Sequence, residues 1–435
     1  MREDVSCSQG AFMYGLVKRL FRICRSMTGN GVRETLKGIA AHLPKLEIHE
    51  VPSGTRCWDW VVPDEWNIRD AHISDKRGKR IVDFQQHNLH VVGYSTPVDK
   101  EISREDLDEH LFSLPELPDA IPYVTSYYRK FWGFCLTENQ RETLSEPHYR
   151  VVIDSSLSSG SLTYADLVVP GESKEEVFFS TYICHPSMAN NELSGPALAT
   201  CLAKWISSQN NRYTYRFVFA PETIGPLVYL SKNLEHLRTN TIAAFNLTCV
   251  GDDLAVSYSP SKSSDTLTDR IAEHVLRHRA PGYITYDFAN HRGSDERQYC
   301  SPGVDLPMVS IMRSRYGDYA GYHNSLDNLD LVSPQGFQTS FDLHKDCITV
   351  LESNKVYSTT IIGEPQLSRR NLMQQFGGEV SMNHWRMLIQ NILMFCDGSR
   401  DLIGVAEKVG EYMIDLLPVV EMLKREALLR EDSQL

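Results

Sequence analysis

Long apolar runs in the middle of the chain limit the folds that this sequence can adopt. They are "YRVVIDSSL" (149–157), "EVFFSTYIC" (176–184), "YRFVFAP" (215–221), "TIAAFNLTCV" (241–250) and "DLPMVSIMR" (305–313). Runs with so few polar breaks are typical of strands that are covered on both faces. Helical patterns at about 195–209, 224–237 and 265–279 alternate with them. The sequence therefore predicts an α/β fold with a mostly parallel sheet and covering helices.

The segments on either side of these runs have different patterns of apolar and polar residues. Residues 11–43 have the pattern of two amphipathic helices that are separated by the turn "TGNG". Residues 57–148 are aromatic and β-branched, with a good hairpin turn at "DKRGKR", and we interpret them as an inserted β-rich module. From residue 366 the pattern becomes three short amphipathic helices, and "DGSRDLIGVAEKVG" has the spacing of a helix-turn-helix unit.

Composition narrows the class of protein further. A chain of 435 residues with 42% hydrophobic residues can form a large core and more than one domain. A net charge of −12 argues against nucleic-acid binding as the main role. The ten cysteines form no C-x-x-C pair, and several lie in apolar runs, as expected of reduced, buried thiols. The start "MREDVSCSQG" is charged, so we expect no signal peptide, no membrane-spanning segment and a cytoplasmic location.

Polar residues follow several of the apolar runs. In a parallel sheet, functional sites form at the carboxyl ends of the strands. This rule selects His185, Glu222, either Asn246 or Asp252, and the loop after Arg313.

Each of these residues also has an ordinary structural interpretation. His185 could be a metal ligand or a structural histidine at a strand end. Glu222 could be a general base or a carboxylate favoured by a helix N-terminus. His323, in the polar loop "GYHNSLDNLD", is by itself more typical of a structural residue.

The segment "NHRGSDERQY" holds four charged residues, which are Arg292, Asp295, Glu296 and Arg297. Its ordinary interpretation is a solvated surface loop. Taken together, however, two histidines and two carboxylate-bearing loops fall at one predicted sheet edge. These are the residue types of a zinc hydrolase, in which imidazoles bind the metal and a carboxylate takes a proton from water.

The motifs, taken in order, resemble those of a known family. They are H-P-S-x-x-N-x-x-L-S-G (185–195), P-E-T-I-G (221–225), V-G-D (250–252), G-S-D-E-R-Q (293–298) and Y-H-N-S-x-D (322–327). This set resembles a bacterial aminopeptidase-like family, which is similar to zinc-dependent exopeptidases with a phosphorylase/hydrolase-like α/β fold. The resemblance implies an α/β domain of residues 1–56 and 149–365. It also implies an inserted β-rich domain (57–148) and a C-terminal winged-helix domain (366–435).

The resemblance also assigns roles to individual positions. His185 and His323 match the two histidine ligands of the zinc peptidases, and Glu222 matches their general base. The three metal-binding carboxylates of those enzymes fall on Thr223, on Asn191 and near Asn246, which are all neutral.

Neutral groups at three ligand positions argue against a two-zinc centre, because an amide oxygen is a poor zinc ligand. The resemblance then implies at most one zinc. Its ligands would be His185, His323 and a rearranged carboxylate, either Glu192 or Asp252, and a site without metal is the alternative.

The leading hypothesis is a hydrolase that cleaves an amide bond in a small peptide-like or aminoacyl metabolite. Glu222 and Asp295 are the candidate catalytic residues: Glu222 would activate water, and Asp295 with Arg292 would engage a polar end of the substrate. Arg292, Asn191 and Tyr322 would contact the substrate. Two alternatives stay open: a non-peptidase amide or ester hydrolase or transferase in a biosynthetic pathway, and a catalytically silent scaffold that binds a partner.

The C-terminal helices raise the question of DNA binding. The segment "DGSRDLIGVAEKVGEY" has two basic residues and four acidic ones, so its charge disfavours contacts with DNA phosphates. Protein packing or association into homo-oligomers fits this segment better.

Overall fold

The computed structural model describes residues 8–370, 372 and 379–432. The N-terminal residues 1–7, on which the expected absence of a signal peptide partly depends, lie outside this range. The chain divides into two compact units. Unit 1 consists of Met1–Asp269 and Tyr283–Phe341, and unit 2 consists of Arg270–Gly282 and Asp342–Leu435. Unit 1 contains both the α/β part and the β-rich insert, and the predicted three-part division of the chain stays a prediction.

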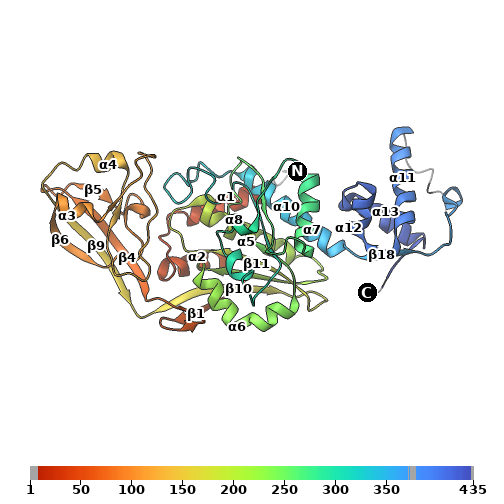
Figure 1. The fold of residues 1–435 in the computed structure, drawn as a ribbon, viewed down its shortest axis with the longest axis horizontal. Coiled ribbons are helices and arrows are strands. Elements are labelled where there is room, and N and C mark those ends of the chain that lie inside the picture. The colour runs from red at the N-terminus through yellow and green to blue at the C-terminus, as the bar shows by residue number, and fades with distance from the viewer. Residues whose placement is uncertain (1–7, 371, 373–378, 433–435) are drawn as a thin grey trace, which may run out of the picture. The chain divides into compact units, whose positions relative to one another are not determined.

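An eight-stranded sheet forms the centre of unit 1, with the strand order β1-β10-β12-β11-β13-β16-β14-β15 (Figure 1). The strands are β1 (Glu47–Pro52), β10 (Ser161–Val169), β11 (Glu176–Tyr182), β12 (Thr214–Ala220), β13 (Thr241–Asn246), β14 (Ser257–Ser259), β15 (Ile284–Thr285) and β16 (Met308–Met312). The middle strands β12, β11, β13 and β16 are parallel to one another, and antiparallel pairings join β1 to β10, β10 to β12 and β14 to β16. Every residue of β11 is buried, as its continuous apolar run predicts. The predicted mostly parallel α/β fold is confirmed.

Helices cover this sheet, as Figure 1 shows. In unit 1 they are α1 (Gln9–Leu20), α2 (Asn30–Ala40), α5 (Ser194–Ile206), α6 (Ile224–Asn240), α8 (Phe288–His291) and α9 (Glu296–Tyr299). Two helices, α7 (Leu267–Arg279) and α10 (Pro334–Ser353), begin in unit 1 and continue into unit 2. A short π-helical turn, η2 (Ala189–Leu193), leads into α5. Both α5 and α6 contact β11, and each follows the carboxyl end of a parallel strand, α5 after β11 and α6 after β12.

The insert is built on a four-stranded antiparallel sheet of order β5-β4-β9-β6. Its elements are β2 (Arg56–Cys57), β3 (Trp60–Val61), β4 (Glu65–Ser74), β5 (Arg80–Asp83), η1 (Asn88–His90), β6 (Val98–Ser103), α3 (Arg104–Asp108), β7 (Leu111–Phe112), β8 (Phe134–Cys135), α4 (Glu138–Glu142) and β9 (His148–Ser158). The predicted turn "DKRGKR" joins β4 to β5, with Gly78 at a φ of +77°.

One strand assignment from the sequence was wrong. The run 149–157 was expected in the parallel sheet, but it lies in β9 of the antiparallel insert. Its side chains alternate: Tyr149, Val151 and Ile153 are buried, whereas Arg150 is exposed. This period of two is typical of a sheet with only one covered face.

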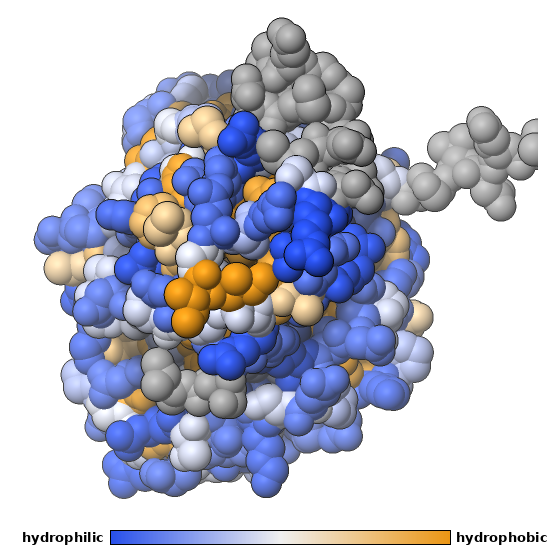
Figure 2. Space-filling view, turned by 90° about the vertical axis from the view of Figure 1, so that its right-hand side faces the viewer, coloured by the Kyte–Doolittle hydropathy of each residue, from blue (hydrophilic) through white to orange (hydrophobic). Residues whose placement is uncertain are grey.

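Unit 2 contains a three-stranded antiparallel sheet and helices in a winged-helix arrangement. Its elements after α10 are β17 (Val356–Thr359), η3 (Leu367–Arg370), α11 (Glu379–Phe395), β18 (Asp397–Asp401), α12 (Leu402–Val409), α13 (Met413–Arg425) and β19 (Leu429–Glu431). Arg270 donates two hydrogen bonds of 2.7 Å to Asp401, whose side chain also caps α12. Figure 2 shows a mostly hydrophilic face with a small apolar patch near its centre.

Two further sequence expectations concern the whole chain. The nine cysteines that the structure describes are all free, and eight of them are buried. Among the described residues, no helix combines the length and the apolar character that crossing a membrane requires.

Candidate active site

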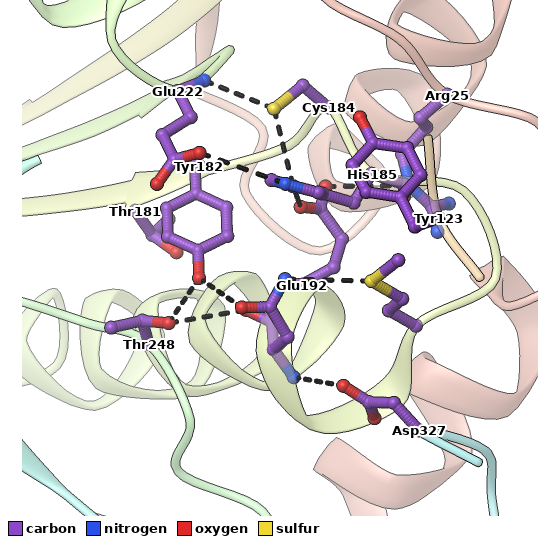
Figure 3. A network of polar contacts seen from close by, with 12 residues as sticks. Arg25, Tyr123, Thr181, Tyr182, Cys184, His185, Glu192, Glu222, Thr248 and Asp327 are labelled. Atoms are coloured by element: carbon purple, nitrogen blue, oxygen red, sulfur yellow. Dashed lines mark hydrogen bonds and ion pairs between the residues drawn. The ribbon is translucent and has the colours of Figure 1, made fainter. Parts of the chain in front are cut away.

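The predicted site lies at the carboxyl ends of β11 and β12 (Figure 3). His185 follows β11, and Glu222 follows β12, which is the parallel neighbour of β11. His185 is only 2% exposed, and its Nε2 atom lies 3.7 Å from Oε2 of Glu222. Parallel pairing therefore brings together two residues that are far apart in the sequence, as the strand-end rule predicts.

The His185 imidazole is held on all sides. Its Nδ1 atom lies 2.9 Å from Oε2 of Glu192, so this nitrogen carries the proton that the carboxylate accepts. The rings of Tyr123, Tyr182 and His323 surround it, with centroid distances of 5.0, 5.4 and 5.2 Å. Only Nε2 remains directed toward Glu222, so the ring orientation is fixed.

A buried arginine lies behind this histidine. Arg25 donates from Nε to the His185 carbonyl oxygen (2.9 Å), and its Nε lies 3.5 Å from Oε1 of Glu192. Both side chains have no exposed surface. Burial alone would lower the pKa of His185, but the hydrogen bond and charge of Glu192 and the charge of Glu222 raise it overall. Arg25, Glu192 and His185 therefore form a buried network in which the negative charge of Glu192 lies between the guanidinium and the imidazole.

Glu222 lies on a constrained turn. The next residue, Thr223, has a φ of +65°, and α6 begins directly after it. The Glu222 amide donates to Sγ of Cys184 (3.2 Å), while its side chain stays 22% exposed. Burial raises the pKa of Glu222, and the positive charges of His185 and Arg297 oppose the shift. A partly exposed carboxylate with a raised pKa suits proton transfer.

Asp295 holds this turn from the other side. Its Oδ1 atom accepts the amide hydrogen of Thr223 (2.8 Å), and its Oδ2 atom has no hydrogen-bond partner among the described residues. Burial raises the pKa of Asp295 well above its ordinary value, and the nearby charge of Glu222 adds to the shift. Asp295 is thus close to Glu222, and its role at the substrate stays a prediction.

The resemblance assigns metal-binding carboxylates to positions that are neutral in this chain, and the neutral side chains there form hydrogen bonds. The Tyr182 hydroxyl donates to Oδ1 of Asn191 (3.0 Å) and contacts Oγ1 of Thr248. Asn246 instead turns away, and its Nδ2 lies 3.2 Å from both Ser294 Oγ and Glu296 Oε2. Thr248, two residues later in the chain, is the neutral side chain that contacts Asn191 here, because its Oγ1 donates to the Asn191 backbone carbonyl oxygen (3.2 Å).

Asp327 fixes the turn that carries Asn191. Its carboxylate accepts the backbone amides of Ala189 (3.0 Å), Asn190 (2.6 Å) and Asn191 (2.8 Å), and the hydroxyl of Tyr319 (3.0 Å). These bonds satisfy the amides at the start of η2, which has no side-chain cap of its own.

The structure brings other predicted residues into different surroundings. Tyr322 stacks on His323 with a centroid distance of 4.0 Å. Arg292 is exposed and donates to Ala289 and Phe288 of its own helix, so it does not reach Glu222. Asp252 accepts hydrogen bonds from the Asn190 side chain and from the amide and hydroxyl of Ser314.

Several site residues escaped the sequence analysis. Arg25, Tyr123, Tyr182 and Thr248 come from apolar or unremarkable stretches, and no local motif marks them. Arg297, by contrast, belongs to the charged segment, and its Nη2 atom donates to Oγ1 of Thr223 (3.3 Å).

The donor set does not fit a resident zinc ion. Among the described residues, Cys184, His185 and Glu192 place ligand atoms within 4.8 Å of one another, but the Arg25 guanidinium already supplies the positive charge there. A second buried cation would add a large desolvation cost, and the one carboxylate of this group, Glu192, already faces both Arg25 and His185. His323 is not part of this group, and its pKa is lowered to about 3 by burial and the charge of His185. The metal role of His185, His323 and Glu192 therefore stays a prediction.

The fold and the site define an aminopeptidase-like α/β protein with a C-terminal winged helix. The chain belongs to the family described as Domain of unknown function (DUF4910), which matches residues 14–354, and residues 355–431 match a winged helix-turn-helix family.

Relatives agree with this assignment. A protein of Clostridium acetobutylicum, named as a candidate polysaccharide biosynthesis protein with an aminopeptidase-like domain, is 44% identical over 96% of this chain and 97% of its own length. A crystal structure of a candidate peptidase from the same species is 42% identical, with a TM-score of 0.91 over 97% of this chain and 96% of that one. The zinc aminopeptidase BSAP of Bacillus subtilis shares the fold alone, at 11% identity and a TM-score of 0.56, over 79% of this chain and 94% of that one.

Proposed function

We propose that this protein is a hydrolase that cleaves an amide bond in a small aminoacyl or peptide-like compound, with Glu222 as the general base. The observation that carries the proposal is the Glu222–His185 pair: a partly exposed carboxylate lies 3.7 Å from the Nε2 atom of a buried, fixed imidazole. Glu222 accepts a proton from the attacking water and delivers it to the leaving amine, which is the usual work of such a base.

His185 has the complementary role. Its Nδ1–H is held by Glu192, and its raised pKa favours a second proton at Nε2. A protonated Nε2 donates to the carbonyl oxygen of the amide as negative charge develops there. Asp295 positions the Glu222 turn through the Thr223 amide, and no step of this scheme passes through a metal.

The name of the Clostridium acetobutylicum relative suggests a metabolic context. It refers to polysaccharide biosynthesis, so the amide in question belongs to an acylated or aminoacylated building block rather than to a protein. The neutral groups at Asn191, Thr223 and Thr248 favour the same substrate class, because general peptide hydrolysis in the similar enzymes uses zinc. A group transfer to an acceptor other than water is the second candidate.

The test is the Glu222→Gln variant. With aminoacyl anilides, dipeptides and N-acyl amino sugars as substrates, its rate should fall by about 100- to 10,000-fold. Glu235→Gln, an exposed carboxylate on α6, is the matched control and should keep the wild-type rate. Full activity in Glu222→Gln would contradict the assigned base. Absence of cleavage by the wild type, with or without added zinc, would favour a silent scaffold.

A further inference from the structure

The insert reaches into the candidate active site through one segment, residues 121–127, which we call the insert wall. The Tyr123 amide donates to the His323 carbonyl oxygen (2.8 Å), and the Ser325 amide donates to the Ile121 carbonyl oxygen (2.9 Å). Oγ of Ser325 also accepts the Ile121 amide at 2.9 Å. The insert wall is therefore bonded, through its backbone, to the loop that carries His323.

Tyr123 is the residue of the insert wall that faces the histidines. Its ring lies 5.0 Å from the ring of His185 and 5.3 Å from that of His323, and it is partly exposed. Its hydroxyl lies 3.4 Å from that of Tyr127. Tyr123 thus covers one side of the His185–His323 pair, and part of its side chain remains exposed.

The insert also holds the loop that follows His185. Asn88 donates from Nδ2 to Oγ of Ser187 (2.9 Å), and Met188 packs among Leu89, Val92, Ile121 and Cys135 of the insert. Both histidine-bearing loops are therefore fixed by the same module.

The insert wall is also anchored from behind. Gly93 donates to the carbonyl oxygen of Val124 (2.8 Å) and accepts from the Ser126 amide (2.9 Å). Between the insert wall and Arg25 the remaining cavity measures about 10 Å³, which is room for about one water molecule. The space between the insert wall and Arg25 is therefore too small for a peptide chain.

From these contacts we propose that the insert wall closes one end of the active site and that Tyr123 sets the substrate length. The inference rests on the proposed hydrolase function. It restricts the substrate to compounds with a single small group on the Tyr123 side of the scissile amide, such as amino-acid amides, and excludes longer peptides. The insert would then be a specificity element rather than a separate binding domain.

The first arm of the test does not depend on activity. Diethyl pyrocarbonate modifies exposed imidazoles, and mass spectrometry locates the product on His185. Tyr123→Ala should raise the modification rate of His185 on the order of tenfold, because the rate follows the exposure of the ring. Tyr123→Phe keeps the ring and should retain the wild-type rate. Tyr128→Ala removes an exposed tyrosine of the adjacent segment and is the matched control.

The second arm compares leucinamide with a tetrapeptide amide as substrates. The wild type should prefer leucinamide by on the order of 100-fold, and Tyr123→Ala should reduce the preference below about tenfold. Tyr123→Leu replaces Tyr123→Ala in both arms if the latter does not fold.

The two arms separate the two proposals. An unchanged modification rate in Tyr123→Ala would refute the proposal that the insert wall covers His185. A raised modification rate in Tyr123→Ala, without any amide cleavage by the wild type, would support the role of the insert wall and refute the hydrolase function. Cleavage with an unchanged length preference in Tyr123→Ala would refute the role of Tyr123 in specificity.

Discussion

Replacing Arg25 by methionine tests the charge balance behind His185. Methionine has a similar length and keeps the site filled, but it removes the positive charge and the bonds to the carbonyl oxygens of His185 and Leu20. Glu192 would then remain buried as an uncompensated negative charge. The turn that presents His185 should consequently open more easily.

The size of the effect follows from the structure. Two unit charges 3.5 Å apart attract each other by about 5 kcal/mol at an effective dielectric constant of about 20. Breaking a buried pair by removing one partner typically costs about 3–5 kcal/mol. We therefore expect Arg25→Met to lower the opening free energy of residues 185–193 by about 4 kcal/mol, which corresponds to about a thousandfold faster amide exchange.

Hydrogen exchange measured on peptides that cover residues 185–193 provides the assay. Arg22→Met, which removes an exposed arginine three residues earlier, is the matched control and should leave exchange unchanged. The double variant Arg25→Met/Glu192→Gln should recover about 2 kcal/mol or more, because the unpaired charge is gone. A coupling near zero in this double-mutant cycle would refute the idea that Arg25 is the counter-ion of Glu192.

Three further predictions concern the same site. Burial raises the pKa of Asp327 to about 6, so the folded chain keeps a proton that the unfolded chain releases. The free energy of unfolding should therefore fall by about 3 kcal/mol in total as the pH rises from well below 4 to well above 6, and Asp327→Asn should remove this part of the pH profile. Elemental analysis of the purified protein should find far less than one zinc per chain, and a stoichiometric zinc that His185→Ala removes would contradict this. Tyr182→Phe should destabilise the fold by about 1–3 kcal/mol in thermal unfolding, because it leaves the buried Oδ1 of Asn191 without its donor.

The pattern of apolar runs was sufficient to predict the central sheet, because a strand covered on both faces has no polar positions to obscure it. β11 is the clearest example, since all of its residues are buried. The same criterion failed for β9, where Val152 and Ser155 are only partly buried and the alternation is hidden by β-branched residues on both faces. Apolar content alone cannot distinguish a strand with two covered faces from a strand with one.

The strand-end rule selected His185 and Glu222 because each follows an apolar run, and Asp295 was added only from the charged segment 290–299. It could not place Arg25 or Tyr123, since both reach the site through contacts between segments that are far apart in the chain. The hydrogen bond from Arg25 to His185 spans 160 positions. Contacts of this kind have no local signature, and only the folded backbone reveals them.

The Asp327 carboxylate also has a consequence for how the protein is made. It accepts the Asn191 amide across 136 positions, and it is the group that holds the turn after His185. Contacts of such large sequence separation form late, because the entropy of closing the intervening loop must be offset by other structure first. During synthesis the turn cannot take its final form before residue 327 has been added. A growing chain would therefore remain without an assembled site until most of unit 1 has been translated.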